Sequence, residues 1–151
     1  MGVLAAGTPV PEFTLRTADG AAFTREQLLG RRTLLVFYPF AFSPVCTDQL
    51  SLYEEVIEEF AEQGVTLYGV SCDATYSQTA FKEQLGVSIE QLSDFEPKGA
   101  ACDAFGVLHP GGFPQRALLL IDAEAVVEWS FEAPTPSDLP GVNLIFDALG
   151  A

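Results

Sequence analysis

Residues 33–46 read TLLVFYPFAFSPVC and combine an apolar strand, a proline turn and the start of a helix. The unbroken apolar run at residues 33–37 is typical of a strand in the middle of a sheet. Ser43 is a preferred N-cap residue, and Pro44 is favoured at the first helical position, where its missing N–H costs nothing. The stretch therefore predicts a strand and then a helix, with Cys46 near the third helical residue.

Cys46 is the candidate reactive group of this stretch. Free backbone N–H groups and the positive end of the helix dipole favour an anion at the start of a helix. The thiolate is the nucleophilic form of cysteine, so this position favours a reactive sulfur. Cysteine is also common as a small buried hydrophobic residue. The proline turn, the Ser43 hydroxyl three residues earlier and the helix start together favour a reactive thiol.

Outward from this stretch, strand and helix patterns alternate. Asp19-Gly20 is a strong hairpin signal, and residues 24–27 read as a capping box. The other expected elements are helices at about 43–63, 77–85, 97–105 and 141–149, and strands at 65–72, 90–93, 117–121 and 126–131. This order predicts an α/β fold with a central mixed sheet and helices on both faces.

Length and charge limit what the chain can be. Its 151 residues, 48% of them hydrophobic, fit one domain over residues 1–151 with a core that needs no disulfides. The first residues lack a basic segment followed by an apolar run, and no run approaches a membrane span, so we expect a cytoplasmic protein. A net charge of −14 argues against binding to nucleic acid or to anionic membranes.

The two remaining cysteines and the single histidine are the other candidates for redox or metal chemistry. No Cys-x-x-Cys is present, so neither a dithiol redox motif nor a zinc knuckle is predicted. Cys72 closes an apolar strand and Cys102 lies in a helix, and core packing is the expectation for both. His109 precedes Pro110 in a loop and is expected at the surface.

A reactive thiol in such an acidic chain needs a cation. Arg116 stands just before the apolar strand at residues 117–121, after a loop rich in glycine and proline. Neighbouring strands of an open sheet can bring this position beside the loop that precedes Cys46. A guanidinium there would favour the thiolate and could hold a substrate oxygen.

Residues 39–46 resemble the peroxiredoxin signature Pro-x-x-x-Thr/Ser-x-x-Cys, through Pro39, Ser43 and Cys46. Arg116 falls where that family carries its later arginine. The resemblance covers the whole chain, from GTPVPEFTL at residues 7–15 to the C-terminal helix. Residues 92–100, LSDFEPKGA, followed by AFGV, are similar to the one-cysteine branch of the alkyl hydroperoxide reductase E type.

The resemblance implies a thioredoxin-like fold and a thiol peroxidase. Cys46 would attack a hydroperoxide oxygen, Pro39 would shield the sulfur, and Ser43 and Arg116, with the Cys46 N–H, would bind the peroxide oxygens. Hydrogen peroxide, alkyl hydroperoxides and peroxynitrite are the implied substrates, and no metal, haem or flavin is required. The candidates for the substrate pocket are Phe40, Phe42, Phe113 and Gln49.

Two positions depart from relatives of this family. Gln49 stands where relatives often have Glu, which should soften the local hydrogen-bond network. Ser51 stands where one branch has its resolving cysteine. No resolving cysteine is therefore assigned, although Cys102 is a weak candidate, and we expect an external thiol or redoxin to reduce oxidised Cys46.

Two other functions stay open at this stage. A redox sensor or adaptor, which passes oxidation to a partner protein, would use the same thiol chemistry. A disulfide reductase is disfavoured by the missing Cys-x-x-Cys. The resemblance also implies a homodimer, which loops rich in phenylalanine allow.

Overall fold

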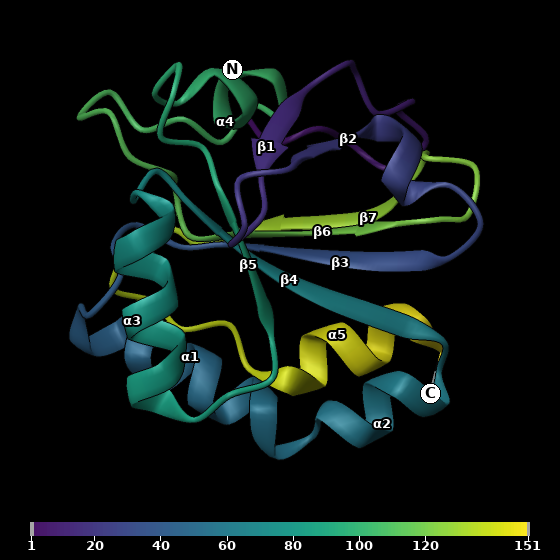
Figure 1. Cartoon of the computed structure of the whole chain (residues 1–151). Helices are drawn as coiled ribbons and strands as arrows, with labels where there is room; N and C mark the ends of the chain where they lie inside the picture. The colour runs from purple at the N-terminus through teal and green to yellow at the C-terminus, as the bar shows by residue number, and fades with distance from the viewer. Residues whose placement is uncertain (1, 151) are drawn as a thin grey trace.

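A seven-stranded mixed sheet forms the centre of the protein, which we describe from a computed structural model over residues 2–150 (Figure 1). In spatial order the sheet runs β2-β1-β5-β4-β3-β6-β7. The strands are β1 (Thr14–Arg16), β2 (Ala22–Thr24), β3 (Arg32–Phe37), β4 (Val65–Ser71), β5 (Glu90–Ser93), β6 (Ala117–Ile121) and β7 (Val127–Glu132).

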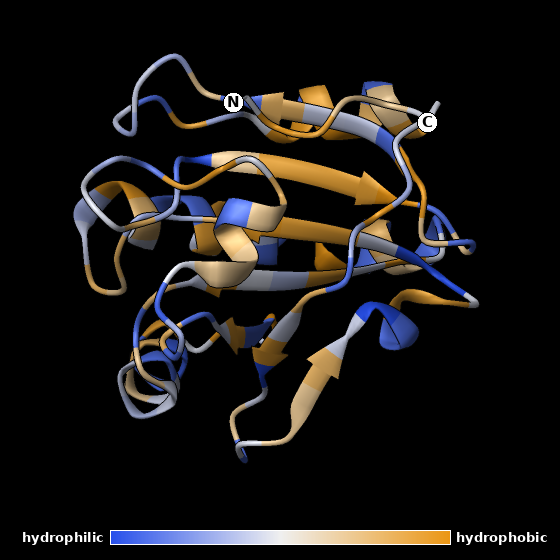
Figure 2. Cartoon of the chain, turned by 90° about the horizontal axis from the view of Figure 1, so that it is seen from above, coloured by the Kyte–Doolittle hydropathy of each residue, from blue (hydrophilic) through white to orange (hydrophobic). Residues whose placement is uncertain are grey.

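Strand direction makes the sheet mixed, as the sequence predicted. β4 runs parallel to both β3 and β5, while β6 pairs antiparallel with β3 and with β7. Strand β3 is central, and all its residues after Arg32 are buried. Such two-sided burial explains why β3 and β6 read as unbroken apolar runs and not as alternating ones. Figure 2 shows the central strands mostly in the hydrophobic colour.

Helices cover both faces of the sheet. One face carries α1 (Pro44–Glu55), α2 (Ile57–Glu62), α3 (Thr75–Leu85) and α5 (Val142–Leu149). The opposite face is covered by α4 (Ala100–Ala104), by the 3₁₀ turn η1 (Arg25–Leu28) and by the β1–β2 edge of the sheet, which folds over this face. The α/β architecture predicted from the alternation of elements is therefore confirmed.

The sheet separates two hydrophobic cores. The core under α1, α2 and α5 contains Cys46 together with residues such as Leu50, Phe60 and Ile145. The core under α4 and the hairpin contains both Cys72 and Cys102. The three thiols thus lie in two separate environments.

The capping box and the hairpin are confirmed. Strands β1 and β2 pair across the turn that contains Asp19-Gly20, with Leu15 opposite Phe23. The Thr24 backbone N–H donates to Gln27 Oε1 at 2.6 Å, and η1 begins directly after Thr24.

Two helix boundaries differ from the sequence prediction. The helix expected at residues 43–63 is broken at Val56, whose φ of −117° and ψ of 22° end α1 before α2 begins. Val56 and Ile57 are both β-branched, which disfavours an uninterrupted helix there. Pro97 does not open α4, because the Asp94 carboxylate accepts the N–H groups of Ala101 and Cys102 and so caps the helix three residues later.

No helix among residues 2–150 combines the length and the apolar character needed to cross a bilayer.

Gly69 is required by a close approach between strands β4 and β5. It lies opposite the buried Gln91, and a Cβ on Gly69 would stand 2.6 Å from Gln91 Oε1. The Gln91 amide is held in place, since Oε1 accepts from the Tyr38 hydroxyl at 2.6 Å and Nε2 donates to the Ile89 carbonyl at 2.9 Å. The amide therefore cannot move aside without losing these bonds.

We expect Gly69→Ala to lower the free energy of unfolding by about 1–3 kcal/mol, because the added methyl group overpacks this contact. The measurement is chemical denaturation followed by circular dichroism. Gly2→Ala is the control, since a Cβ there meets nothing within 4 Å. Equal unfolding midpoints for the two variants would contradict the prediction.

Candidate active site

Cys46 is the third residue of α1, directly after the loop that leaves β3. Ser43 is the N-cap with extended backbone, Pro44 is the first helical residue, and the Cys46 side chain is 0% exposed. These positions agree with the sequence prediction. The Ser43 side chain makes no capping hydrogen bond within the described chain, so its hydroxyl is available to another group.

Strand pairing brings Arg116 to the sulfur. Ala117 lies opposite Phe37 in the β3–β6 pair, so the preceding Arg116 reaches the loop that follows β3. Its Nη2 donates to Cys46 Sγ at 3.1 Å, and the residue is only 2% exposed. A contact between residues 70 positions apart is thus made by two neighbouring strand ends.

Two further bonds orient the guanidinium. Arg116 Nε donates to the Pro136 carbonyl at 2.7 Å, and Nη1 donates to Gln49 Oε1 at 2.5 Å. Gln49 lies one turn after Cys46 on α1, so the helix supplies both the sulfur and a neighbouring acceptor. All three guanidinium nitrogens are therefore engaged in a fixed geometry.

Gln49 also continues the network into the segment before α5. Its Nε2 donates to the Tyr53 hydroxyl at 3.1 Å, and that hydroxyl donates to the Pro140 carbonyl at 2.7 Å. An amide both accepts and donates, which allows it to bridge Arg116 and Tyr53. Gln49 therefore links the two residues directly, and the softening expected relative to a Glu at this position stays a prediction.

Burial keeps Tyr53 in its neutral, donating form. Desolvation raises the pKa of Tyr53 to about 12, against a smaller lowering by its hydrogen bond with Gln49. The hydroxyl therefore keeps its proton at neutral pH and can donate to Pro140 while it accepts from Gln49.

Apart from Cys46, the hydrogen-bond partners of the Arg116 guanidinium are neutral groups. Within residues 2–150 the salt bridges are Arg32–Glu128 and Lys82–Glu90, and neither involves Arg116. Its partners are a carbonyl, an amide oxygen and the sulfur. A buried charge is costly unless an opposite charge accompanies it, and the one partner that can ionise is the Cys46 thiol.

A cavity of about 270 Å³ opens above this arrangement. It is bounded by the turn before Cys46, the strand end at Arg116 and the segment before α5. Its lining residues are Pro39, Phe40, Ser43, Pro44, Val45, Phe113, Arg116, Pro136 and Ser137. Pro39, Ser43 and Arg116 thus share one small cavity beside the buried sulfur.

The four candidate pocket residues separate into two groups. Phe40 and Phe113 line the cavity, with ring centroids 4.8 Å apart. Phe42 does not line it and packs against Phe81 at 5.1 Å. Gln49 is fully buried and accepts a hydrogen bond from Arg116 Nη1, so it does not line the cavity either.

Sequence reasoning missed the contribution of residues 133–141. This segment, APTPSDLPG, supplies the Pro136 and Pro140 carbonyls and the cavity residue Ser137. Its three prolines were a signal of an extended, stiff segment, although nothing in the sequence indicated which site it would meet.

Asp73 was also missed, and it holds the loop before the helix. Its Oδ2 accepts from the Ala41 N–H and from the Ser71 hydroxyl, both at 2.8 Å. The end of β4 therefore anchors the turn between Pro39 and Ser43.

The other polar candidates lie away from the sulfur. The His109 ring stacks on Phe113 at 4.2 Å, and its Nδ1 accepts from the Gly111 N–H. Within residues 2–150, Cys46 belongs to no group of three side chains of the kind that bind metals. Cys72 and Cys102 lie in the core on the opposite face of the sheet.

Comparison with known proteins gives one consistent family. Residues 6–130 match the model of the AhpC/TSA family. Peroxiredoxin Q, chloroplastic, of Oryza sativa subsp. japonica is 31% identical over 86% of this chain. The chain spans 60% of the length of that curated relative.

Two mycobacterial proteins match over nearly the full length of both chains. Alkyl hydroperoxide reductase E of Mycobacterium tuberculosis is 28% identical over 99% of this chain and 98% of its own length. The crystal structure of peroxidoxin BcpB from Mycobacterium tuberculosis superposes with a TM-score of 0.81 at 25% identity, covering 97% of this chain and 95% of the other. The expected thioredoxin-like fold is thereby confirmed.

We expect Gln49→Leu to slow alkylation of Cys46 by iodoacetamide about tenfold, since losing a hydrogen bond to a charged group costs about 1.5 kcal/mol and frees the guanidinium to turn. Gln49→Glu, which keeps the acceptor, should retain most of the reactivity. The measurement is the rate at which Cys46 gains the label, by mass spectrometry.

Thr33→Val is the control, because Thr33 is equally buried, lies at the end of β3 away from the Cys46 loop, and its hydroxyl has no hydrogen-bond partner among residues 2–150. The orienting role of Gln49 is refuted if Gln49→Leu and Thr33→Val label Cys46 at the same rate.

Proposed function

This chain belongs to the AhpC/TSA family, and we propose that it is a thiol-dependent peroxidase that reduces hydrogen peroxide, alkyl hydroperoxides or peroxynitrite. The observation that carries the proposal is the contact of Arg116 Nη2 with Cys46 Sγ at 3.1 Å beside a small cavity. A cation, a buried sulfur and an adjoining cavity are the parts that attack on a peroxide requires.

In the proposed reaction the Cys46 thiolate attacks one oxygen of the hydroperoxide. A sulfur–oxygen bond forms and the oxygen–oxygen bond breaks. The oxygen that is not attacked leaves, takes up a proton from solvent, and departs as water or an alcohol. The sulfur is oxidised to sulfenic acid and the peroxide is reduced by two electrons. No metal, haem or flavin takes part in this step.

The Arg116 guanidinium faces the reacting sulfur from inside the protein. Its other hydrogen-bond partners are a backbone carbonyl and an amide oxygen, which hold it in place. The same guanidinium then faces the negative charge that develops on the leaving oxygen. Groups held in advance near such a charge stabilise the transition state without reorganising.

Ser43 and the helix start complete the proposed oxygen-binding groups. The first backbone bond of α1 runs from the Thr47 N–H to the Ser43 carbonyl, so the Cys46 N–H precedes the helical ladder. We assign this N–H and the Ser43 hydroxyl to the peroxide oxygens. Pro39, which is buried and lines the cavity, limits the access of water to the sulfur.

The cavity wall favours organic as well as inorganic hydroperoxides. Phe40 and Phe113 form an apolar edge, and Phe40 is 48% exposed, so part of a substrate can rest on it. Burial of an alkyl group against these rings would add to binding without contacting the reacting oxygens.

We propose that an external thiol or a redoxin reduces oxidised Cys46. Position 51 is Ser, and Cys72 and Cys102 lie in the core across the sheet from Cys46. A cytoplasmic location belongs to this proposal, because a cycle reduced by external thiols requires a reducing compartment. The catalytic unit is one domain, supported by the single sheet that unites strands from residues 14–132.

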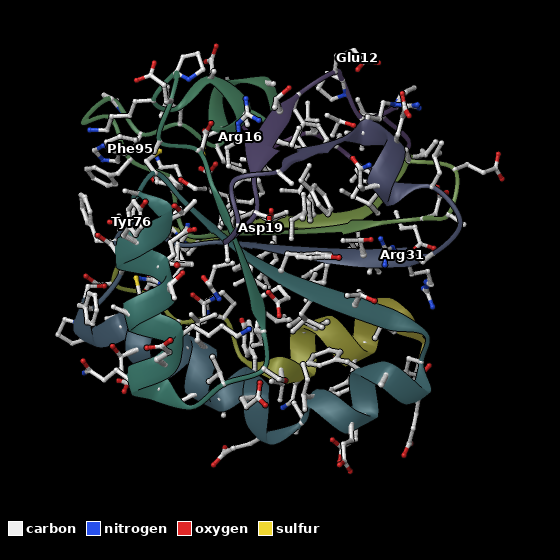
Figure 3. All side chains as sticks on the ribbon, in the orientation of Figure 1. Glu12, Arg16, Asp19, Arg31, Tyr76 and Phe95 are labelled. Atoms are coloured by element: carbon white, nitrogen blue, oxygen red, sulfur yellow. The ribbon has the colours of Figure 1, made fainter. Side chains whose placement is uncertain are left out.

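A homodimer is also part of the proposal. Several aromatic side chains are exposed: Phe40, which lines the cavity, and Phe42, Tyr76 and Phe95 are 45–87% exposed. Figure 3 shows Tyr76 and Phe95 on the same side of the molecule. A second copy of the chain would remove these rings from water.

We expect Cys46→Ser to abolish rapid peroxide consumption and Arg116→Ala to slow it by about 10²–10³-fold, the effect typical of losing one charge-stabilising donor. Stopped-flow mixing with hydrogen peroxide measures the first turnover, and steady-state assays with dithiothreitol or a redoxin measure the cycle. Arg31→Ala serves as a control, because that exposed arginine donates its side-chain hydrogen bonds within residues 2–150 to the Gln27 carbonyl alone.

Rapid consumption by Cys46→Ser would refute the assigned nucleophile. An unchanged rate in Arg116→Ala would refute only the role of the cation. Rapid oxidation without turnover by any reductant would instead favour a redox sensor that passes oxidation to a partner protein.

The one-cysteine cycle predicts the product of a single equivalent of peroxide. Cys46 should be trapped as a sulfenic acid by dimedone, and Cys72→Ala and Cys102→Ala should give the same adduct at the same rate. Peptide mass spectrometry locates the modified residue. A disulfide between Cys46 and either Cys72 or Cys102 would overturn this cycle.

A further inference from the structure

A second pair of thiols lies on the face of the sheet opposite Cys46. Cys72 directly follows β4, and Cys102 is in the middle of α4. They are 7% and 0% exposed and belong to the same hydrophobic core. The sequence predicted core packing for each thiol separately, and it contained no signal that the two would meet.

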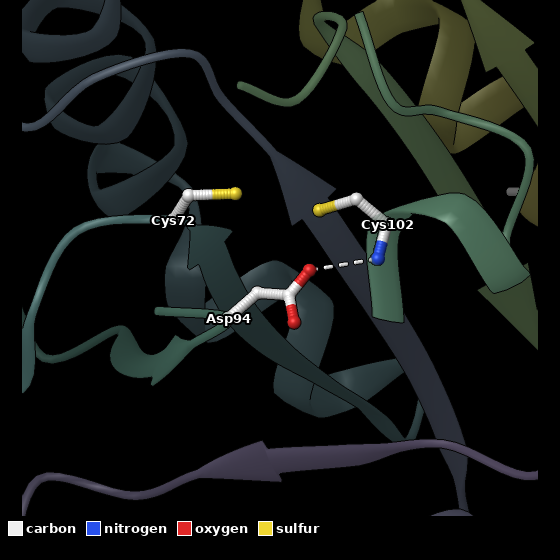
Figure 4. A group of neighbouring side chains, drawn as sticks. All are labelled: Cys72, Asp94 and Cys102. Carbon is white, nitrogen blue, oxygen red and sulfur yellow. Dashed lines mark hydrogen bonds between the residues drawn. The ribbon is translucent and has the colours of Figure 1, made fainter. Parts of the chain in front are cut away.

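The two sulfurs face each other beside a carboxylate (Figure 4). The sulfurs of Cys72 and Cys102 and an oxygen of Asp94 all lie within 4.8 Å of one another. A disulfide bond is about 2.05 Å long, so the sulfurs would have to approach by less than about 3 Å. Side-chain rotation of the two cysteines and a small shift of a short helix can supply this movement.

The short helix α4 is suited to such a shift. It has five residues, and Gly99 and Gly106 on either side both adopt positive φ. Asp94 fixes the first turn, because its carboxylate oxygens accept the Ala101 N–H at 3.1 Å and the Cys102 N–H at 2.8 Å. Because Cys102 lies in the turn that Asp94 holds, the approach of its sulfur comes mainly from rotation about its Cα–Cβ bond, and the flanking glycines allow the rest of the short helix to adjust around it.

The chemical environment distinguishes the two thiols. A hydrogen bond with Cys102 is the main influence that lowers the pKa of Cys72, with a smaller lowering by Lys98. The same interaction and burial raise the pKa of Cys102. Asp73 and Asp94 are the other charged groups near the pair, and both oppose ionisation of Cys72. Cys72 is thus the more exposed thiol and the one more readily ionised.

We propose that Cys72 and Cys102 form a second redox site, a dithiol that closes to an intrachain disulfide when hydrogen peroxide oxidises Cys72. Cys72 attacks one peroxide oxygen and becomes a sulfenic acid, and water leaves. The Cys102 sulfur then attacks the Cys72 sulfur, forming the disulfide and releasing a second water. In total, two thiols and one hydrogen peroxide give one disulfide and two waters.

Burial selects the oxidant. Cys72 is only 7% exposed, so hydrogen peroxide can reach its sulfur more easily than a bulky disulfide can. The sheet between the two cores keeps the pair from resolving Cys46. The dithiol therefore takes up its own equivalent of oxidant, whether or not Cys46 is the nucleophile proposed above.

Cys46→Ser protein isolates the second site for the test. The protein is incubated with excess hydrogen peroxide and then unfolded in the presence of N-ethylmaleimide, which alkylates free thiols. Its intact mass is measured by mass spectrometry. We expect a mass lower by about 2 Da with no maleimide attached, reversal by dithiothreitol, and a peptide that links Cys72 to Cys102. The protein should remain monomeric on a non-reducing gel, which identifies the bond as intrachain.

Two double variants serve as controls, with Cys46→Ser combined with either Cys72→Ala or Cys102→Ala. The remaining thiol should then be alkylated or carry oxygen, with no loss of about 2 Da. Because the main measurement leaves both cysteines in place, it does not depend on the folding of these variants.

Three results would overturn the proposal. Both thiols could still react fully with N-ethylmaleimide after exhaustive exposure to peroxide. Alternatively, each sulfur could gain oxygen without a bond forming between the two. The purified protein could also hold one zinc ion that the Cys72→Ala change removes, which would make the cluster a metal site. None of these results would bear on peroxide reduction at Cys46.

Discussion

The contact between the Arg116 guanidinium and the Cys46 sulfur is the constraint on which the arrangement of the site depends. A charge that is only 2% exposed needs an acceptor for each of its nitrogens, and two separate parts of the chain supply the three acceptors. Helix α1 supplies the sulfur and the Gln49 amide, and the segment before α5 supplies the Pro136 carbonyl. The antiparallel pairing of β3 with β6 places Arg116 among them.

This hydrogen-bond network connects helix α1 to Arg116 and to the segment before α5. Cys46, Gln49 and Tyr53 follow one face of α1, since residues three and four apart are neighbours on a helix. The Tyr53 hydroxyl ends the chain of bonds at the Pro140 carbonyl, directly before α5. Hydrogen bonds therefore connect this segment to the sulfur through Tyr53, Gln49 and Arg116.

The sheet also divides the thiols by environment. Cys46 lies beside a cation and a cavity, whereas Cys72 and Cys102 lie with a carboxylate in the opposite core. One chain thus holds a thiol in contact with a guanidinium and, in the opposite core, a pair of thiols that face each other.

Local signals in the sequence were strong where one residue imposes one conformation. Apolar runs identified β3 and β6, and the Ser43-Pro44 pair identified the start of α1 to the residue. The same kind of reasoning failed where a distant group decided a boundary. Asp94 caps α4 from the end of β5, so the helix begins after Pro97, and the break at Val56 left two helices where one apolar stripe predicted a single helix.

By itself the sequence determined the strand, the proline turn and the helix start that set Cys46 near free backbone N–H groups, because these depend on residues adjacent along the chain. It also indicated Arg116 as the available cation. Only the tertiary structure decided that Gln49 would orient this cation from inside the core, that the segment of residues 133–141 would close the cavity, and that Cys72 and Cys102 would meet. These contacts join residues 20 to almost 90 positions apart, and strand order and packing, to which no local pattern is sensitive, bring them together.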